Sequence, residues 1–239
     1  MEKNAIVAVC DILGFSNTVN SVSQEKLINF HLKNIQNIKK TAFQHYNLPA
    51  TIPKDNKEVF NKNLLGHAFF SDTVLIYSVL DSRDGRRNLL NAVFYLLSYP
   101  MFNPYYKFRI GVSYGEFYND QKQNIFAGKA LVEAAKLESI QEWSGAAFTD
   151  AAAHLFSSYY PENEMLIDYD VPIKQKNYKK TKKLKVLNWT LANHTKQPKY
   201  NWMPREENGI EIKKYKSTKV ENKIKNTEKF HRDLCVKCK

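Results

Sequence analysis

An apolar stretch near the N-terminus places an acidic side chain at the end of a strand-length segment. Residues 6–10 read Ile-Val-Ala-Val-Cys, and Asp11 and a turn around Gly14 follow directly. A continuous apolar run of this length is typical of a strand that is buried on both faces of a sheet. We therefore expect a central strand that carries the Asp11 carboxylate to its end, where the chain turns.

A second acid occupies a matching position further along the chain. Residues 66–70 and 73–79 have the composition of two strands, joined by a tight turn that contains Asp72. If this hairpin lies beside the first strand, the carboxylates of Asp11 and Asp72 converge. Two carboxylates next to a loop of backbone N–H groups suit a divalent cation that also binds a triphosphate, because the phosphates supply the remaining oxygen ligands.

The rest of the chain alternates between helical and strand patterns. A Ser-x-x-Gln capping box at Ser21 predicts a helix that ends near Asn47, residues 51–63 have the composition of a polar loop, and residues 84–99 show helical spacing of leucines. The order of elements predicts an α+β fold with a ferredoxin-like βαββαβ core, in which helices cover one face of a mainly antiparallel sheet. Further expected elements are strands at residues 108–115, 124–127, 146–149, 165–168 and 184–191, and a helix at residues 128–143.

Length and composition favour one domain with an appendage. The chain has 239 residues, of which 43% are hydrophobic, and no apolar run reaches the about 18 residues of a membrane span. The N-terminus lacks the pattern of an export signal, and three cysteines are too few for a disulfide framework. We therefore expect a cytoplasmic protein with a catalytic domain at residues 1–192, whose core spans 5–150, and a basic extension at 193–239.

The net charge of +12 is concentrated in the last third of the chain. Seven of the twelve residues at 174–185 are lysines, and lysines are frequent again after residue 196. A solvated lysine-rich surface explains this pattern, and binding of nucleic acid or another anionic surface is the alternative. His231, Cys235 and Cys238 form three-quarters of a zinc site, for which a frayed terminus is the alternative interpretation.

Four sequence blocks occur along the first two thirds of the chain: Cys-Asp-Ile-Leu-Gly-Phe-Ser at 10–16, Phe-Ser-Asp-Thr-Val at 70–74, Phe-Arg-Ile-Gly-Val-Ser-Tyr-Gly at 108–115, and residues 128–138. Together they resemble the class III nucleotidyl cyclases, in the family's order and over roughly residues 5–150. The continuation Gln-Glu-Trp-Ser-Gly at residues 141–145 and the short format resemble the bacterial pyrimidine cyclases of the Pycsar antiphage system.

The resemblance implies a site for two divalent cations, Mn²⁺ or Mg²⁺, and a nucleotide. The carboxylates of Asp11 and Asp72 and the backbone carbonyl of Ile12 would hold the cations. In this family one cation activates the ribose 3′-hydroxyl and the other neutralises the triphosphate, so the hydroxyl attacks the α-phosphorus and pyrophosphate leaves. The β- and γ-phosphates would bind backbone N–H groups of the turn formed by Leu13, Gly14, Phe15 and Ser16.

The chain departs from the family on the helix at residues 128–143. Family members bring an asparagine and, four residues later, an arginine from this helix to the site of a partner subunit. Here these positions hold Val132 and Lys136. Lys136 can still place a positive charge on the transferring phosphoryl group, whereas Val132 cannot orient a ribose. The resemblance thus implies a homodimer with shared sites and a catalytic role for Lys136; an exposed surface lysine is the alternative. Arg109 matches a family arginine that we interpret as mainly structural.

Purine-specific members of the family recognise the base with two polar side chains. The residues at these two positions here favour a pyrimidine substrate. Gly66 and Ile125 occupy these positions, with His67 and Asn124 as their neighbours. Neither Gly66 nor Ile125 offers a side-chain hydrogen bond to a purine edge, which removes the usual source of purine selectivity. Together with the resemblance, this predicts conversion of UTP or CTP to cyclic UMP or cyclic CMP, which a cyclic-nucleotide-binding effector would read in antiphage defence.

Three alternatives to a pyrimidine cyclase stay open from the sequence. The chain can be an ordinary adenylate or guanylate cyclase, or a degenerate cyclase retained as a regulatory domain. It can also be a non-catalytic ferredoxin-like module that binds nucleic acid through its lysines. Retention of Asp11 and Asp72 favours an enzyme, because an RNA-binding sheet needs exposed stacking aromatics rather than paired carboxylates.

Overall fold

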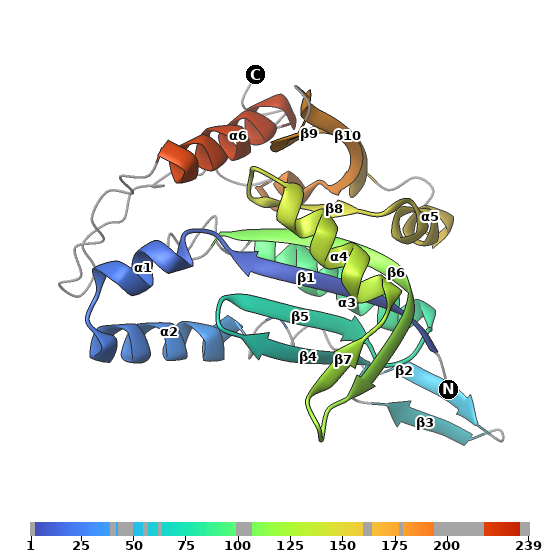
Figure 1. The fold of residues 1–239 in the computed structure, drawn as a ribbon. Helices are drawn as coiled ribbons and strands as arrows, with labels where there is room; N and C mark the ends of the chain where they lie inside the picture. The colour runs from blue at the N-terminus through green and yellow to red at the C-terminus, as the bar shows by residue number, and fades with distance from the viewer. Residues whose placement is uncertain are drawn as a thin grey trace.

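A twisted sheet forms the centre of the molecule in the computed structural model, which describes residues 3–38, 42, 50–54, 57–61, 64–98, 107–159, 164–176, 179–193 and 218–234 (Figure 1). Its strand order is β4-β5-β1-β6-β8-β10-β9, with β7 paired to β6 alone. Only the β6–β8 pair is parallel among the pairings of this sheet in the described residues. The predicted α+β fold with a mainly antiparallel sheet is confirmed. The strands are β1 (Lys3–Ile12), β4 (Leu65–Phe70), β5 (Thr73–Ser78), β6 (Phe108–Asp120), β7 (Ile125–Ala127), β8 (Gly145–Phe148), β9 (Leu166–Lys176) and β10 (Lys179–Leu187).

Strand β1 is central because its side chains are apolar on both faces. Ile6, Ala8 and Cys10 point into one layer of the core, and Val7 and Val9 point into the other. None of these five side chains is more than 7% exposed. The strand pairs antiparallel with β5 on one side and with β6 on the other, as the unbroken apolar run predicts.

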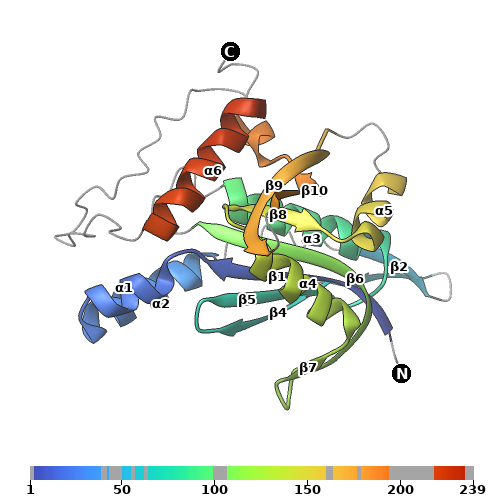
Figure 2. The same ribbon diagram turned by 45° about the horizontal axis from the view of Figure 1, so that its top comes forward.

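Helices cover both faces of the sheet, so the expectation of helices on one face is wrong. Helix α3 (Arg83–Ser98) packs on the face of β1 that carries Ile6, and α4 (Lys129–Ile140) packs on the opposite face (Figures 1 and 2). Gly111 on β6 makes the second arrangement possible, because a Cβ atom there would lie 2.1 Å from the carbonyl oxygen of Ala134. The absence of a side chain at this position lets the backbone of α4 rest directly on the sheet.

The start of one helix and the end of another differ from the boundaries that the sequence predicts. Helix α1 (Phe15–Ser21) precedes α2 (Gln24–Ile38), and the cap of α2 is Ser23, whose Oγ accepts the N–H of Lys26 at 3.4 Å. The capping box expected at Ser21 is therefore wrong, since that residue ends α1; the expected end near Asn47 lies outside the described residues. Helix α4 ends at Ile140 rather than at Trp143.

The segment expected as a polar loop at 51–63 contains a hairpin of β2 (Ala50–Lys54) and β3 (Lys57–Asn61). Pro53 and the charged residues of this segment are depleted in strands, so the pattern hid both elements.

Two further helical elements follow strands β8 and β10. They are α5 (Asp150–Tyr159) and a short 3₁₀ helix at Trp189–Asn193. No helix in the described ranges is long and apolar enough to cross a membrane.

Part of the expected basic extension belongs to the main core. Residues Thr218–Leu234 form helix α6, and its Phe230 is fully buried among aromatic rings. The centroid of the Phe230 ring lies 4.6 Å from that of Trp143 and 4.8 Å from that of Tyr169. Residues 194–217 lie outside the described residues, so the boundary at 192 stays a prediction, but α6 packs as an integral element of the fold.

The residues proposed for a zinc site are only partly described. His231 is buried, with its ring centroid 5.7 Å from that of Trp189. Cys235 and Cys238 lie outside the described residues, so the zinc hypothesis stays a prediction.

Candidate active site

Asp11 and Asp72 lie side by side at one end of the sheet. Asp11 is the penultimate residue of β1, and it pairs with Thr73 on β5. Asp72 lies in the turn between β4 and β5, and its backbone carbonyl accepts the N–H of Ile12 at 3.0 Å. The structure thus brings together the two carboxylates, and also Ile12, on adjacent segments of backbone.

The Asp11 carboxylate is held by an arginine. Nη2 of Arg109 donates to Oδ2 of Asp11 at 2.9 Å, and the two side chains are 9% and 23% exposed. Burial raises the pKa of Asp11, the Arg109 charge opposes that rise, and the nearby Asp72 carboxylate raises the pKa further. Two negative charges therefore face each other where a cation would stabilise both of them.

Arg109 is the hub of a buried network that ties three elements together. Its Nε donates to Glu138 on α4, and its Nη1 donates to the backbone carbonyl of Gln141 at 3.1 Å. Burial, followed by the nearby Asp11 charge, raises the pKa of Glu138, while Arg109 lowers it. The arginine thus fixes Asp11 relative to α4, a positioning role that fits the structural interpretation from the sequence. The sequence did not identify Glu138 as its partner.

The turn predicted to bind phosphates leads directly into α1. Gly14 has φ of 81°, a left-handed conformation that glycine adopts without strain, and α1 begins at Phe15. The N–H of Leu13 donates to the carbonyl of Lys107 at 2.8 Å. Leu13 therefore uses its N–H within the fold, and a phosphate role for Gly14, Phe15 and Ser16 stays a prediction.

The two residues on α4 that the resemblance singles out point away from the sheet. Val132 is 49% exposed and Lys136 is exposed. In the described part of the chain, Lys136 forms no ion pair with Asp11 or Asp72. The structure of one chain thus leaves Lys136 apart from the carboxylates, on the surface that a partner would meet.

The residues predicted to line a base pocket differ in how far they are buried. Gly66 is buried under the ring of Tyr77, whose Cζ would lie 2.2 Å from a Cβ at this position. His67 is half-buried on β4 and packs edge-on against Phe69. The other two residues lie where β7 begins: Asn124 has φ of 58°, and Ile125 is 45% exposed.

Sequence reasoning missed a polar group beside Gly66. The hydroxyl of Tyr77 accepts a hydrogen bond from Nε2 of Gln121 at 2.7 Å. Tyr77 pairs with Gly66 across the β4–β5 ladder, so the strand register alone would have placed the phenol over the glycine.

No family model matches the sequence, and neither does any curated protein. Among solved structures, the catalytic core of a rhodopsin-guanylyl cyclase with converted specificity, in complex with ATPαS, superposes with a TM-score of 0.53 at 11% identity. The match covers 78% of this chain and 95% of that one. An adenylate cyclase from Trypanosoma brucei in its monomeric state matches with a TM-score of 0.50 at 15% identity, over 78% and 88% of the chains. This chain has the fold of a cyclase catalytic core.

The Arg109 network generates a stability prediction. Arg109→Gln leaves the carboxylates of Asp11 and Glu138 buried without their counter-charge, so we expect the free energy of unfolding to fall by about 3–5 kcal/mol. Adding Glu138→Gln to that variant should recover part of the loss, because it removes one buried charge. Urea unfolding at neutral pH measures both effects.

Arg87 offers a matched control, since its ion pair with Asp84 is 3.0 Å long and its side chains are 40% and 35% exposed, against 9% and 10% for the Arg109–Glu138 pair. Arg87→Gln should cost about 1 kcal/mol or less. Equal losses for Arg109→Gln and Arg87→Gln would contradict a buried network.

Proposed function

We propose that the protein is a nucleotidyl cyclase that converts UTP or CTP to its 3′,5′-cyclic monophosphate and pyrophosphate. The observation that carries this proposal is the convergence of Asp11 and Asp72 at the end of β1, on a fold shared with cyclase catalytic cores. In the cytoplasm, the product would act as a signal in antiphage defence, read by an effector that binds the cyclic nucleotide.

The donor set fits two divalent cations, Mn²⁺ or Mg²⁺, that bind together with the nucleotide. The described residues contain no group of three or more His, Cys, Asp or Glu side chains that could hold a metal ion by themselves. Asp11, Asp72 and the carbonyl of Ile12 supply hard oxygens on adjacent segments, which suits these cations once phosphate oxygens complete the coordination. Bound cations would neutralise the triphosphate and lower the pKa of the ribose 3′-hydroxyl.

The chain's own residues would position the substrate around that centre. Arg109 holds Asp11 through Oδ2 and so fixes the direction of its carboxylate. The turn of Gly14, Phe15 and Ser16 would direct backbone N–H groups to the β- and γ-phosphates. A fixed carboxylate and a fixed turn lower the barrier by holding the 3′-hydroxyl in line with the α-phosphorus.

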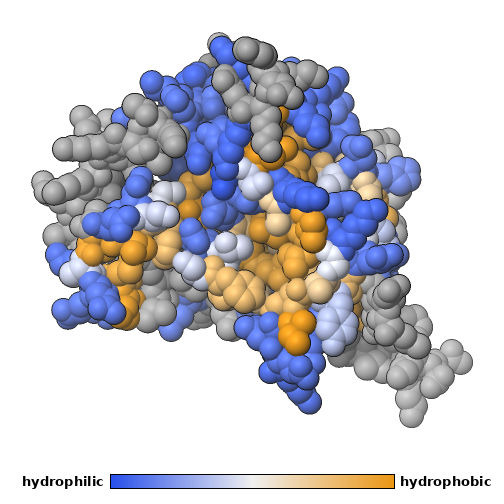
Figure 3. All heavy atoms as spheres, in the orientation of Figure 1, coloured by the Kyte–Doolittle hydropathy of each residue, from blue (hydrophilic) through white to orange (hydrophobic). Residues whose placement is uncertain are grey.

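A homodimer would complete the site. The face that carries α4 and β7 exposes apolar side chains, and Figure 3 shows them gathered over this side of the molecule. An exposed apolar patch rimmed by polar residues is typical of a protein interface. A two-fold partner on this face would bring its Lys136 to the carboxylates that this chain's own Lys136 does not contact. The exposed side chains are Phe70, Tyr118, Ile125 and Val132.

The pyrimidine preference rests on the two base-reading positions. Gly66 lies under the Tyr77 ring and Ile125 is apolar, so neither side chain can hydrogen-bond a purine edge. Adenylate or guanylate cyclase activity is the alternative, since the solved structures with this fold include both kinds of enzyme.

A product assay tests the proposed reaction. Incubation with each of the four ribonucleoside triphosphates and Mn²⁺ should give cyclic UMP or cyclic CMP as the dominant product, identified by chromatography and mass spectrometry. Dominant cyclic AMP or cyclic GMP would replace the pyrimidine proposal with a purine cyclase. Absence of any cyclic product would favour a non-catalytic module.

Subunit mixing tests the shared site. Asp11→Ala and Lys136→Ala should each be nearly inactive alone. At equal mixing, half of the dimers are mixed and each has one intact site, so about a quarter of wild-type turnover should return.

The matched control for this experiment is a mixture of Asp11→Ala with Asp72→Ala. Both acids would belong to the same subunit's half of the site, so no mixed dimer regains an intact one. Failure of the Asp11→Ala and Lys136→Ala mixture, even after co-expression, would contradict shared sites.

A further inference from the structure

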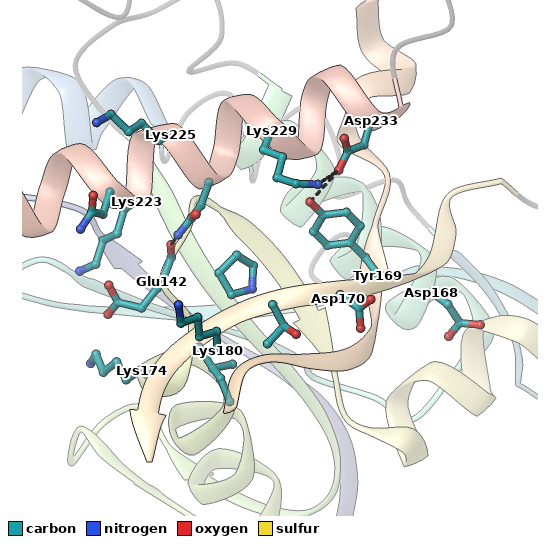
Figure 4. Close-up of a pocket in the computed structure, with 15 residues that line it drawn as sticks. Glu142, Asp168, Tyr169, Asp170, Lys174, Lys180, Lys223, Lys225, Lys229 and Asp233 are labelled. Atoms are coloured by element: carbon teal, nitrogen blue, oxygen red, sulfur yellow. Dashed lines mark hydrogen bonds and ion pairs between the residues drawn. The ribbon is translucent and has the colours of Figure 1, made fainter. Parts of the chain in front are cut away.

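A cavity lies between α6 and the hairpin of β9 and β10, apart from any residue that the proposed reaction uses. Its volume is about 1300 Å³, and side chains from α6, from both strands of the hairpin and from Glu142 line it (Figure 4). Figures 1 and 2 both show α6 beside β9, although the two elements are more than 40 residues apart in the sequence. The cavity is therefore created by the docking of α6.

The walls of the cavity are joined to one another through Glu142. The backbone N–H of Glu142 donates to the carbonyl of Pro172 on β9 at 2.8 Å, and its carbonyl accepts Nδ2 of Asn226 on α6 at 2.7 Å. At the next residue of α6, the Thr227 hydroxyl accepts the N–H of Ser144 at 2.8 Å. These bonds and the burial of Phe230 hold α6 at a fixed distance from the hairpin.

The two ends of the cavity differ in how their charges are balanced. At one end, the Tyr169 hydroxyl and Nζ of Lys229 both donate to Oδ2 of Asp233, at 3.2 Å and 2.5 Å. This end carries its own counter-charge, and Figure 4 shows the three side chains directed at one another.

The opposite end carries an excess of positive charge. Lys174 from β9, Lys180 from β10 and Lys223 from α6 line it together with a single acid, Glu142 (Figure 4). Within the described ranges, none of these three lysines takes part in an ion pair. Burial and then the charge of Arg109 lower the pKa of Lys223, Glu142 opposes this, and Lys174 lowers the pKa further. Among the described residues at this end, only one carboxylate therefore balances the mutual repulsion of three lysines.

An anion with several negative oxygens is the ligand that relieves this repulsion. Ammonium groups bind phosphates as point charges and need no planar geometry. Three lysines from two strands and one helix can therefore surround a polyphosphate. RNA is a poorer fit, because single-stranded RNA needs exposed aromatic rings. Among the described residues that line the cavity, Tyr169 is the only aromatic one, and its ring is stacked on that of the buried Trp143.

We propose that this cavity binds a phosphate-bearing anion through Lys174, Lys180 and Lys223, and that the anion clamps α6 onto the hairpin of β9 and β10. The cavity wall is linked to the carboxylate centre through the backbone at residues 141–142. Gln141, whose carbonyl accepts Nη1 of Arg109, directly precedes Glu142 in the cavity wall. The anion is either the triphosphate of a nucleotide that binds here, outside the carboxylate centre, or a separate phosphate compound.

Calorimetry with inorganic tripolyphosphate tests the site without any turnover. The titration is done in EDTA, so that the result does not depend on cations at Asp11 and Asp72 or on cyclase activity. Wild-type protein should bind the anion, and the double variant Lys174→Gln and Lys223→Gln should bind it at least tenfold more weakly. Lys183→Gln, which removes an exposed lysine of β10 that does not line the cavity, should change the affinity less than twofold. Figure 4 shows the lining lysines that the double variant removes.

Hydrogen exchange supplies a second readout that a change in global stability would not mimic. Tripolyphosphate should slow amide exchange in α6 and in the hairpin of the wild-type protein, and it should have no such effect in the double variant. No binding by wild-type protein, or equal binding by the double variant, overturns the proposal. Lysine-dependent binding of a single-stranded RNA without binding of tripolyphosphate also overturns it, in favour of a nucleic-acid surface.

Competition distinguishes the two sources of the anion. If a nucleotide binds here through its triphosphate, 3′-deoxy-UTP in EDTA should exclude tripolyphosphate from the cavity. If the ligand is a separate phosphate compound, 3′-deoxy-UTP should leave the affinity for tripolyphosphate unchanged. Either result supports the cavity as a phosphate site, and the difference between them identifies the source of the anion.

Discussion

The ion pair between Arg109 and Asp11 is the interaction on which the proposed site depends. Arg109 extends from β6, and its guanidinium binds the end of β1, the last turn of α4 and the residue that follows α4. A buried arginine with two carboxylate partners is stable only while all three charges are present, because each carboxylate alone would be a buried charge. The same group that sets the direction of Asp11 therefore also sets where α4 ends.

That constraint also fixes the surface that α4 would present to a second subunit in the proposed dimer. Glu138 faces the sheet and is held by Arg109, whereas Lys136 and Val132 face solvent on the same helix. Gly111 lets the helix backbone approach β6 closely, so α4 is fixed in both position and rotation. A rigid helix that presents its outer face is what a shared active site requires of each subunit.

The sequence predicted those features that depend on neighbouring residues. The apolar run of β1 encodes burial on both faces, and the short turn around Asp72 encodes a hairpin. The convergence of the two acids also required the hairpin to lie beside β1, which the sequence left as a condition and the β1–β5 pairing fulfils. The Arg109–Glu138 pair joins residues 29 positions apart, and no local periodicity reveals it. Helix α6 was hidden because its few core residues, such as Phe230, are separated by lysines and polar residues that resemble a solvated tail.

The central claim is that Asp11 and Asp72 together hold a cation that binds with a nucleotide. Electron paramagnetic resonance of Mn²⁺ in the presence of 3′-deoxy-UTP measures this directly, because the analogue lacks the attacking hydroxyl and cannot turn over. We expect the wild-type protein to bind Mn²⁺ and the analogue together, and Asp72→Asn to weaken Mn²⁺ binding by more than about tenfold while it keeps its fold. Equal Mn²⁺ affinity in the two proteins would contradict the claim.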